Sequence, residues 1–174
     1  MSHTQEADPV MTPDAECKIL LCDETLTLPS TQIDWIRLTL QISDDVVEKF
    51  ILHGLYEILH GHVSMQSLFA SIFLYRKYIT LETGYQNEDY KVLGVAIFHI
   101  CRKIHETQCG NMRVYFGDNI KTSDISKKIE EIKEKEMSIL KLFNFNVGFR
   151  KNILEYEKQF NENILEHEKI AKLV

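Results

Sequence analysis

The most apolar stretch of the chain is Asp89–Glu106, and its middle is hydrophobic at almost every position. Between residues 92 and 101 the polar exception is His99. A helix that is apolar on all sides has no face left for water, so it must lie inside a domain. A buried strand is the alternative for a short apolar run, but this run continues into charged residues, and Gly94 and Ala96 are poor strand formers. We therefore predict a central buried helix.

Two amphipathic segments precede this stretch, and each begins at residues that suit a helix N-cap. Ser43–Asp45 opens the first segment, whose apolar residues recur at helical spacing until Gly61. Ser64 opens the second, which ends before Gly84. Both segments are predicted to be helices that present one apolar stripe to a core.

The C-terminal half adds two longer predicted helices, residues 122–143 and residues 152–173. Between them and the central helix, residues 112–116 are apolar but are bracketed by Gly and Asn, which indicates a single turn or a loop. Residues 33–42 alternate in part like a strand. Because no second strand is available for pairing, a short helix or irregular chain is the better interpretation. The predicted fold class is all-α.

The remaining segments set the predicted domain boundaries. Residues 1–27 are polar and contain two prolines, which favours a flexible arm. Residues 28–149 are predicted to form one helical domain with its N-terminal extension. Residues 150–174 are predicted to form a separate C-terminal helix.

Composition narrows the function classes. A chain of 174 residues suits one domain with a real core. Its net charge of −6, with acidic and basic residues interspersed, argues against direct nucleic-acid binding. Four cysteines without a CxxC pair indicate a reduced intracellular chain. There is neither an apolar run of membrane-spanning length nor a signal peptide, so no membrane partner is expected.

One charged residue interrupts an apolar stripe. The stripe of the 122–143 helix consists of Ile125, Ile129, Ile132, Leu140 and Phe143. Helical periodicity places Glu136 in its middle, four residues from both Ile132 and Leu140. Either the stripe passes near the surface at this point, or the carboxylate is buried against a basic partner, because an unpaired buried charge is too costly.

Such a partner stands at the end of the central helix. Lys103 follows the apolar run on the stripe that contains Val92, Ala96 and His99. The simplest role of a lysine there is to complement the negative end of the helix dipole. If the central helix packs against the 122–143 helix, Lys103 and Glu136 can instead meet at one end of the groove between them.

The two motifs around these residues resemble those of the cyclin family. Residues 44–149 are similar to the cyclin box, a bundle of five helices with a hydrophobic third helix at its centre. In that family the third helix ends in lysine, a hydrophobic residue and acidic residues, and the fifth carries glutamate before a leucine-rich run and a Phe-polar-aliphatic close. Here residues 102–106 read RKIHE and residues 136–147 read EMSILKLFNFNV. Both motifs match in order and spacing.

The resemblance implies an all-α fold, with a five-helix cyclin box flanked by an N-terminal arm and a C-terminal helix. It also implies that Lys103 and Glu136 hold the backbone of the kinase helix that carries the active-site glutamate. The other residues expected to bind a kinase are Ile104, Glu106, Met137, Leu140 and Phe145. The apolar members of this set are expected to line the contact.

The subtype rests on weaker signals. Residues 28–30 (Leu-Pro-Ser) and Tyr75–Arg76 are similar to transcription-type cyclins such as cyclins L, K and T. Mitotic-type cyclins usually place Asp near the position of Arg76, paired with an Arg of the first helix, and this sequence lacks that pair. His105 replaces an acidic residue of the motif, which predicts a slight pH dependence of the kinase contact. Residues 150–174 are too few for a second box, so a single-box cyclin, a shortened chain and a reduced relative all remain open.

The function implied by the resemblance is regulatory. A cyclin binds a cyclin-dependent serine/threonine kinase in the conformation whose mobile helix is swung inward, and so completes the Lys–Glu ion pair that positions ATP. The chain is then not an enzyme, needs no cofactor and works as one copy in a heterodimer with its kinase. The kinase is expected to be of a transcription or RNA-processing type. The expected location is the nucleus, with the cytoplasm as a second location.

Other functions find less support. The first is a transcription-factor scaffold, because the same helical repeat occurs in general transcription factor IIB, although those repeats are basic and paired. The second is a cyclin-like adaptor that binds partners without activating a kinase. A zinc site at His53, His60 and His62 lacks further ligands at sensible spacing, and no motif of an enzyme nucleophile or phosphate loop is present.

Overall fold

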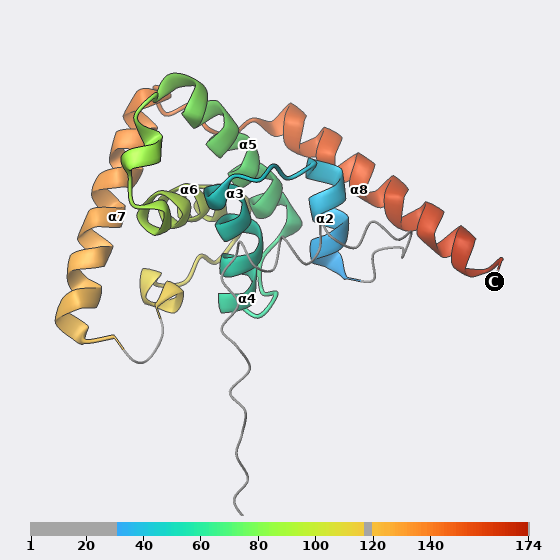
Figure 1. Ribbon diagram of the computed structural model, residues 1–174, viewed down its shortest axis with the longest axis horizontal. Helices are drawn as coiled ribbons and strands as arrows, with labels where there is room; N and C mark the ends of the chain where they lie inside the picture. The colour runs from blue at the N-terminus through green and yellow to red at the C-terminus, as the bar shows by residue number, and fades with distance from the viewer. Residues whose placement is uncertain (1–30, 117–119, 174) are drawn as a thin grey trace, which may run out of the picture.

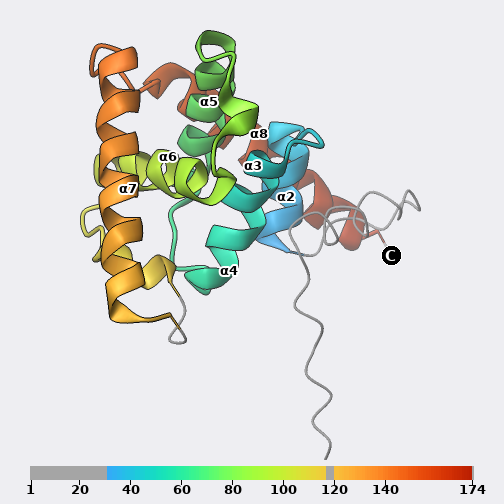
Figure 2. The ribbon, with the colours of Figure 1, turned by 60° about the vertical axis from the view of Figure 1, so that its left-hand side comes forward.

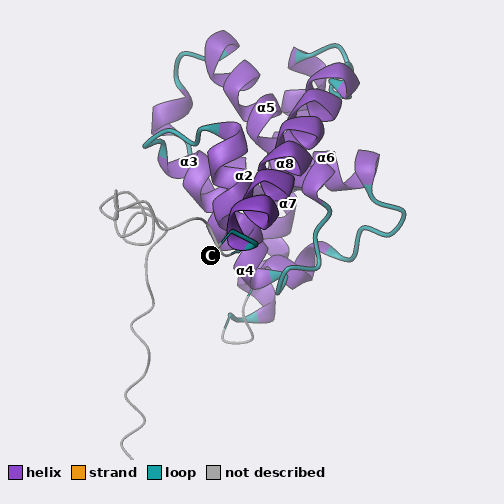
Figure 3. Cartoon of the chain, turned by 90° about the vertical axis from the view of Figure 1, so that its right-hand side faces the viewer, coloured by secondary structure: helices purple, strands orange, loops and turns teal. Residues whose placement is uncertain are grey.

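The computed structural model describes residues 31–116 and 120–173, and within these ranges the chain consists of helices joined by loops (Figure 1, Figure 3). In chain order the elements are α2 (Gln32–Leu40), α3 (Val46–Lys49), the π-helix η1 (Phe50–Leu55), α4 (Tyr56–Ile58), α5 (Met65–Leu81), the 3₁₀-helix η2 (Tyr85–Asn87), α6 (Tyr90–His105), the 3₁₀-helix η3 (Met112–Tyr115), α7 (Thr122–Leu142) and α8 (Arg150–Ala171). The all-α prediction is confirmed. The predicted arm, residues 1–27, and the Leu-Pro-Ser sequence at 28–30 lie outside the described residues.

Helix α6 forms the centre of the fold, as its apolar sequence predicts. Every residue from Val92 to Arg102 is buried, and the helix packs against α3, η1, α5 and α7. Figure 2 shows α6 lying across the middle of the molecule beside the upright α7. The carboxylate of Asp89 caps its start by accepting hydrogen bonds from the backbone N–H groups of Lys91 and Val92, at 2.9 and 3.3 Å.

The predicted first helix is one continuous helical path with an irregular middle. Asp45 caps it and accepts from the N–H of Val47 at 2.8 Å. The path then passes from α3 through the π-helical turn η1 to α4, and it ends at Ile58. His60 and Gly61 follow with positive φ angles of 51° and 75°, so the stop predicted at Gly61 is confirmed. The hydrophobic periodicity of this segment predicts an ordinary helix and does not indicate the π-helical turn.

Residues 32–40 form the helix α2, which settles the ambiguous pattern of the N-terminal segment. Thr31 caps this helix by accepting from the N–H of Asp34 at 3.2 Å. Ile36 and Leu40, four residues apart, are buried on the face toward the bundle. The strand-like alternation is therefore misleading, and the short-helix interpretation is confirmed.

Helix α8 packs across α2 and α5 and carries the chain away to its C-terminus (Figure 1). Ile153 and Phe160 are its buried residues. The ring of Phe160 meets that of Phe69 on α5 edge to face, with centroids 5.9 Å apart. The helix begins and ends two residues earlier than the periodicity predicts.

The described part of the link between α6 and α7 contains little regular secondary structure. Its described part holds only the four-residue turn η3, which agrees with the prediction of a single turn for residues 112–116. A five-helix box would place its fourth helix in this segment, and the described part of the link holds only η3, so the predicted five-helix arrangement is not confirmed. Among the described helices, none is apolar and long enough to cross a membrane.

Candidate functional site

Lys103 and Glu136 form an ion pair where the end of α6 meets α7. The ammonium Nζ of Lys103 lies 2.7 Å from Oε1 of Glu136. The carboxylate side chain is 7% exposed, whereas the lysine side chain is 47% exposed. Of the two interpretations of Glu136, burial against a basic partner is confirmed, and a stripe that passes near the surface is not. The buried anion fixes the position of a cation that still faces solvent.

The environment of Glu136 makes its charge costly. Burial raises the pKa of Glu136 above its usual value of 4.5, while the ammonium groups of Lys103 and Lys133 act in the opposite direction. Burial outweighs the attraction of the two lysines. The charged carboxylate therefore lowers the stability of the fold at neutral pH relative to a neutral group in the same place.

Apolar side chains follow the two charged residues in the sequence, at the end of α6 and along and just after α7. Ile104 and Met137 are each 46% exposed, Phe145 is 62% exposed, and Leu140 is half-buried. We call the set of Lys103, Ile104, Glu136, Met137, Leu140 and Phe145 the α6–α7 face. Exposed apolar groups near a half-exposed cation that a buried anion holds in place are typical of protein-binding surfaces.

The backbone after α7 presents the most exposed member of this face. Asn144 and Phe145 both have positive φ angles, 51° and 60°. The N–H of Phe145 donates to the carbonyl of Leu140 at 2.7 Å, which closes the end of the helix. Phe145 is thereby directed outward, although an aromatic residue in the left-handed region is uncommon.

Glu106, the seventh residue expected to bind a kinase, lies apart from this face. Its carboxylate accepts from the N–H of Ser64 at 3.1 Å, from Oγ of Ser67 at 2.8 Å and from Nε of Arg102 at 2.7 Å. These contacts join the start of α5 to the end of α6. The side chain of Glu106 is only 11% exposed. Glu106 therefore helps to fix the orientation of the end of α6, where Lys103 lies.

Arg102 belongs to a buried polar cluster that the sequence does not indicate. Its Nη1 donates to the hydroxyl of Tyr115 at 3.2 Å, and this hydroxyl also lies 3.0 Å from Nδ1 of His99. The same ring nitrogen is 3.4 Å from Sγ of Cys109. Burial lowers the pKa of His99 to about 4 and raises that of Cys109. A neutral histidine beside a thiol of raised pKa is unsuited to nucleophilic catalysis.

A hollow of about 460 Å³ borders the α6–α7 face. Ile104, His105, Arg150 and Leu154 are among the residues that line it. Burial lowers the pKa of His105, so this side chain is neutral at neutral pH. The Nε2 atom of His105 is buried without a hydrogen-bond partner among the described residues. The hollow can accept a side chain of a protein that covers the face.

An ion pair also joins the first helical path to α5. Its cation lies on α5 and its anion on α3. Arg76 donates through Nε to the buried carboxylate of Glu48 and through Nη2 to the carbonyl of Leu40 at 2.8 Å. Glu48 also accepts from the N–H and Oγ of Ser43, at 3.0 and 2.8 Å. The chain thus lacks an Asp–Arg pair here, as the sequence indicates, but it has an Arg–Glu pair that links α2, α3 and α5.

Histidines do not gather into a metal site in the described ranges. Groups of three or more His, Cys, Asp or Glu side chains that could hold a metal ion are not found there. His53 is buried, and burial lowers its pKa to about 4.

Comparison of the chain with protein-family models, with curated proteins and with solved structures gave no match.

Proposed function

We propose that this chain is a cyclin-type regulatory subunit that binds a cyclin-dependent serine/threonine kinase through the α6–α7 face and raises its activity. The observation that carries the proposal is the pair formed by half-exposed Lys103 and buried Glu136 among exposed apolar side chains. A buried carboxylate that lowers stability indicates a role other than stability. That role is to hold an ammonium group ready for a partner.

The chemistry of the face suits the backbone of a helix. An ammonium group has three N–H donors and no acceptor, so Lys103 can donate to the free carbonyls at a helix C-terminus while it remains paired with Glu136. Ile104, Met137 and Phe145 supply apolar area that an amphipathic helix can cover. The adjacent hollow gives one side chain of that helix a place to insert.

Activation then follows from differential binding. A kinase helix that reaches the face only when swung inward is stabilised in that position, because the contacts are absent from the inactive conformation. Catalysis remains with the kinase, and the regulatory chain requires neither a catalytic residue nor a cofactor. The proposed partner is a kinase of transcription or RNA-processing type, bound by one copy of this chain in the nucleus, with the cytoplasm as a second location.

Charge reversal on the face tests the proposal. The native chain, Lys103→Glu and Glu136→Lys are compared for binding to a panel of cyclin-dependent kinases and for stimulation of peptide phosphorylation. One kinase is expected to bind the native chain and gain activity. Each reversal is expected to weaken binding by about a hundredfold, because a desolvated charge at an interface loses its partner.

Matched controls lie on α8. Lys158 and Glu162 are exposed there, and Lys158→Glu and Glu162→Lys make the same changes in net charge. These variants should bind and activate like the native chain. If no kinase binds the native chain, or if the control reversals weaken binding as much as those on the face, the proposal is wrong.

A second candidate is a cyclin-like adaptor that binds a kinase or another protein without activating it. The inward orientation of Glu106 favours this candidate, because it removes an acidic group that the cyclin motif places after the lysine. The same assay separates the two. Binding that depends on Lys103 and Glu136 but leaves phosphorylation unchanged supports the adaptor.

A further inference from the structure

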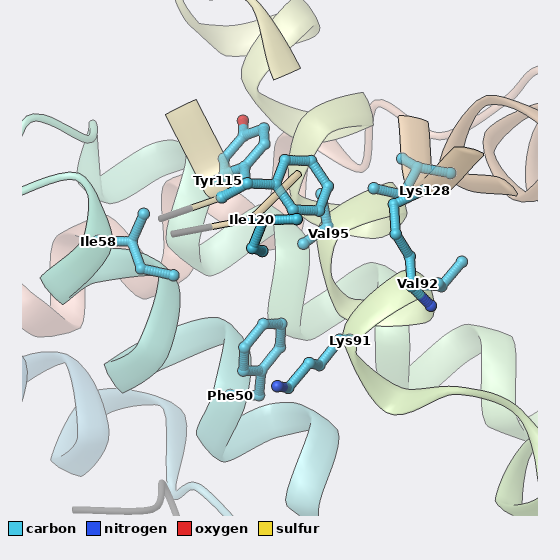
Figure 4. A pocket seen from close by; sticks show the side chains of 10 residues that line it. Phe50, Ile58, Lys91, Val92, Val95, Tyr115, Ile120 and Lys128 are labelled. Atoms are coloured by element: carbon cyan, nitrogen blue, oxygen red, sulfur yellow. The ribbon is translucent and has the colours of Figure 1, made fainter. Parts of the chain in front are cut away.

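A second cavity lies at the opposite end of α6 from Lys103. It is a chamber of about 320 Å³ between η1, α6, η3 and α7, and its walls include Phe50, Val92, Val95, Ile120 and Ile132 (Figure 4). Lys91 begins the wall from α6, about 18 Å along the helix from Lys103 at 1.5 Å per residue. The volume lies at the lower end of the range for small-molecule sites, and the walls are as apolar as such sites usually are.

The floor of the chamber is fixed before any ligand arrives. Phe50 lies against two glycines, since a Cβ atom added at Gly94 or Gly54 would stand 2.6 or 2.9 Å from its ring. The ring also meets that of Tyr90 edge to face, with centroids 5.5 Å apart. Phe50 is the first residue of the π-helix η1, and π-helical turns are frequent at functional sites.

Tyr115 contributes an apolar wall although it carries a hydroxyl. Figure 4 shows its ring beside the chamber with the hydroxyl pointing away. That hydroxyl bonds with His99 and Arg102 in the buried polar cluster. The interior of the chamber is therefore mostly apolar, which favours a hydrocarbon or aromatic group.

Two ammonium groups stand at this chamber, and none of its lining residues is acidic. Lys128 is already engaged, with Nζ 3.0 Å from Asp89 and 3.3 Å from Glu131. Lys91 lies 5.9 Å from the ring of Tyr90 and forms no ion pair with a described residue. Its exposed ammonium group is thus available to an anion at the mouth of the chamber.

We propose that this chamber binds a small amphipathic carboxylate. The apolar body lies among Phe50, Val95 and Ile132, and the carboxylate accepts hydrogen bonds from the ammonium group of Lys91. Burial of the body supplies most of the affinity, and the charge-assisted hydrogen bond selects an acid over a neutral compound of the same length. This site is separate from the α6–α7 face and does not depend on the function proposed for that face.

Isothermal titration with decanoate and decanol tests the proposal on the whole chain. Decanoate should bind at one site per chain, and decanol at least about tenfold more weakly. Lys91→Met keeps most of the length of the side chain and removes its charge. It should weaken decanoate binding about tenfold and leave decanol binding unchanged, whereas Lys127→Met, an exposed lysine outside the chamber, should change neither.

A variant that fills the chamber gives an independent check. Ile120 is 42% exposed at the mouth, so Ile120→Trp can occupy the space without disturbing the buried core. This variant should keep its helix content and melting temperature and lose both ligands. The proposal is overturned if decanoate does not bind, if decanol binds equally well, or if Lys91→Met has no effect. It is also overturned if the native chain is a dimer that Ile120→Trp dissociates, because the chamber is then an interface between copies.

Discussion

The two side chains of the Lys103–Glu136 ion pair differ in exposure, and this difference predicts different effects on stability when each is substituted. Glu136→Gln keeps an acceptor for Lys103 and removes a buried charge, so the free energy of unfolding should stay unchanged or rise by up to about 1 kcal/mol. Lys103→Met leaves the buried carboxylate without its nearest cation. Because Lys103 is half-exposed, the loss should be about 1 to 3 kcal/mol, less than for a fully buried pair. Urea unfolding measures both, and a larger loss for Glu136→Gln would contradict this assignment.

The raised pKa of Glu136 also predicts a pH dependence. The folded state holds the proton of Glu136 more tightly than the unfolded state does. The contribution of this group to stability is therefore present below pH 4.5 and is lost as pH rises through the folded pKa. Lys103→Met removes an attraction that lowers this pKa, so its destabilisation should be larger at about pH 8 than at about pH 5. Equal losses at the two pH values would show that Glu136 is not perturbed by burial.

At the scale of elements, the contact between Arg76 and Glu48 holds α2, α3 and α5 together. Glu48 is 2% exposed on its side chain, so removal of Arg76 leaves an uncompensated buried charge. Arg76→Met should lower the free energy of unfolding by about 3 kcal/mol, and Arg76→Met with Glu48→Met should recover most of the loss. Thermal and urea denaturation measure these changes.

The matched control for this prediction is Lys77→Met, at the exposed residue next to Arg76. It should cost less than about 1 kcal/mol. If the double variant at positions 76 and 48 is no more stable than Arg76→Met alone, the buried charge of Glu48 is not the cause of the loss.

Helix α8 is predicted to be an integral part of the fold. Phe160→Ala opens a cavity against Phe69 and should cost about 3 to 4 kcal/mol, whereas Leu165→Ala, at a side chain that is 55% exposed, should change stability by less than about 0.5 kcal/mol. Denaturant unfolding of the two variants measures the difference. Equal, small effects would show that α8 contributes little to the stability of the bundle.

Local patterns in the sequence predict most of the helices. The cap residues Asp45 and Ser64 begin helices as expected, and the apolar run in residues 92–101 is buried, His99 included. Periodicity predicts these features because each depends on neighbours within one or two turns. The sequence pattern of residues 32–40 is ambiguous because a nine-residue helix offers only two turns of pattern.

The sequence predicts only part of the side-chain pairing between helices. Glu136 stands out because it breaks an apolar stripe, and this signal leads to Lys103. Glu106 and Glu48 give no such signal. Glu106 accepts a hydrogen bond from Ser64 and Glu48 accepts one from Arg76, and both contacts depend on how helices that are distant in the sequence cross. The chamber beside Phe50 depends in addition on a π-helical turn and on two glycines, which no periodicity reveals.

At the scale of the whole molecule, the two proposed binding regions lie at opposite ends of one buried helix. The end of α6 carries the α6–α7 face, and its start borders the apolar chamber. Because α6 is buried from Val92 to Arg102 and packed on several sides, both ends belong to a rigid scaffold. A rigid face favours tight binding, since little conformational freedom is lost when a partner docks.

We propose that Lys103 and Glu136 form a contact for a kinase and are not merely a structural pair. The double variant Lys103→Glu with Glu136→Lys tests it most directly, because it restores an ion pair of inverted polarity. We predict that its stability recovers toward the native value while kinase binding and activation remain lost, since the exposed position now carries an acceptor where a partner's carbonyl groups need a donor. Recovery of kinase binding together with stability would contradict the claim and leave the pair with a structural role alone.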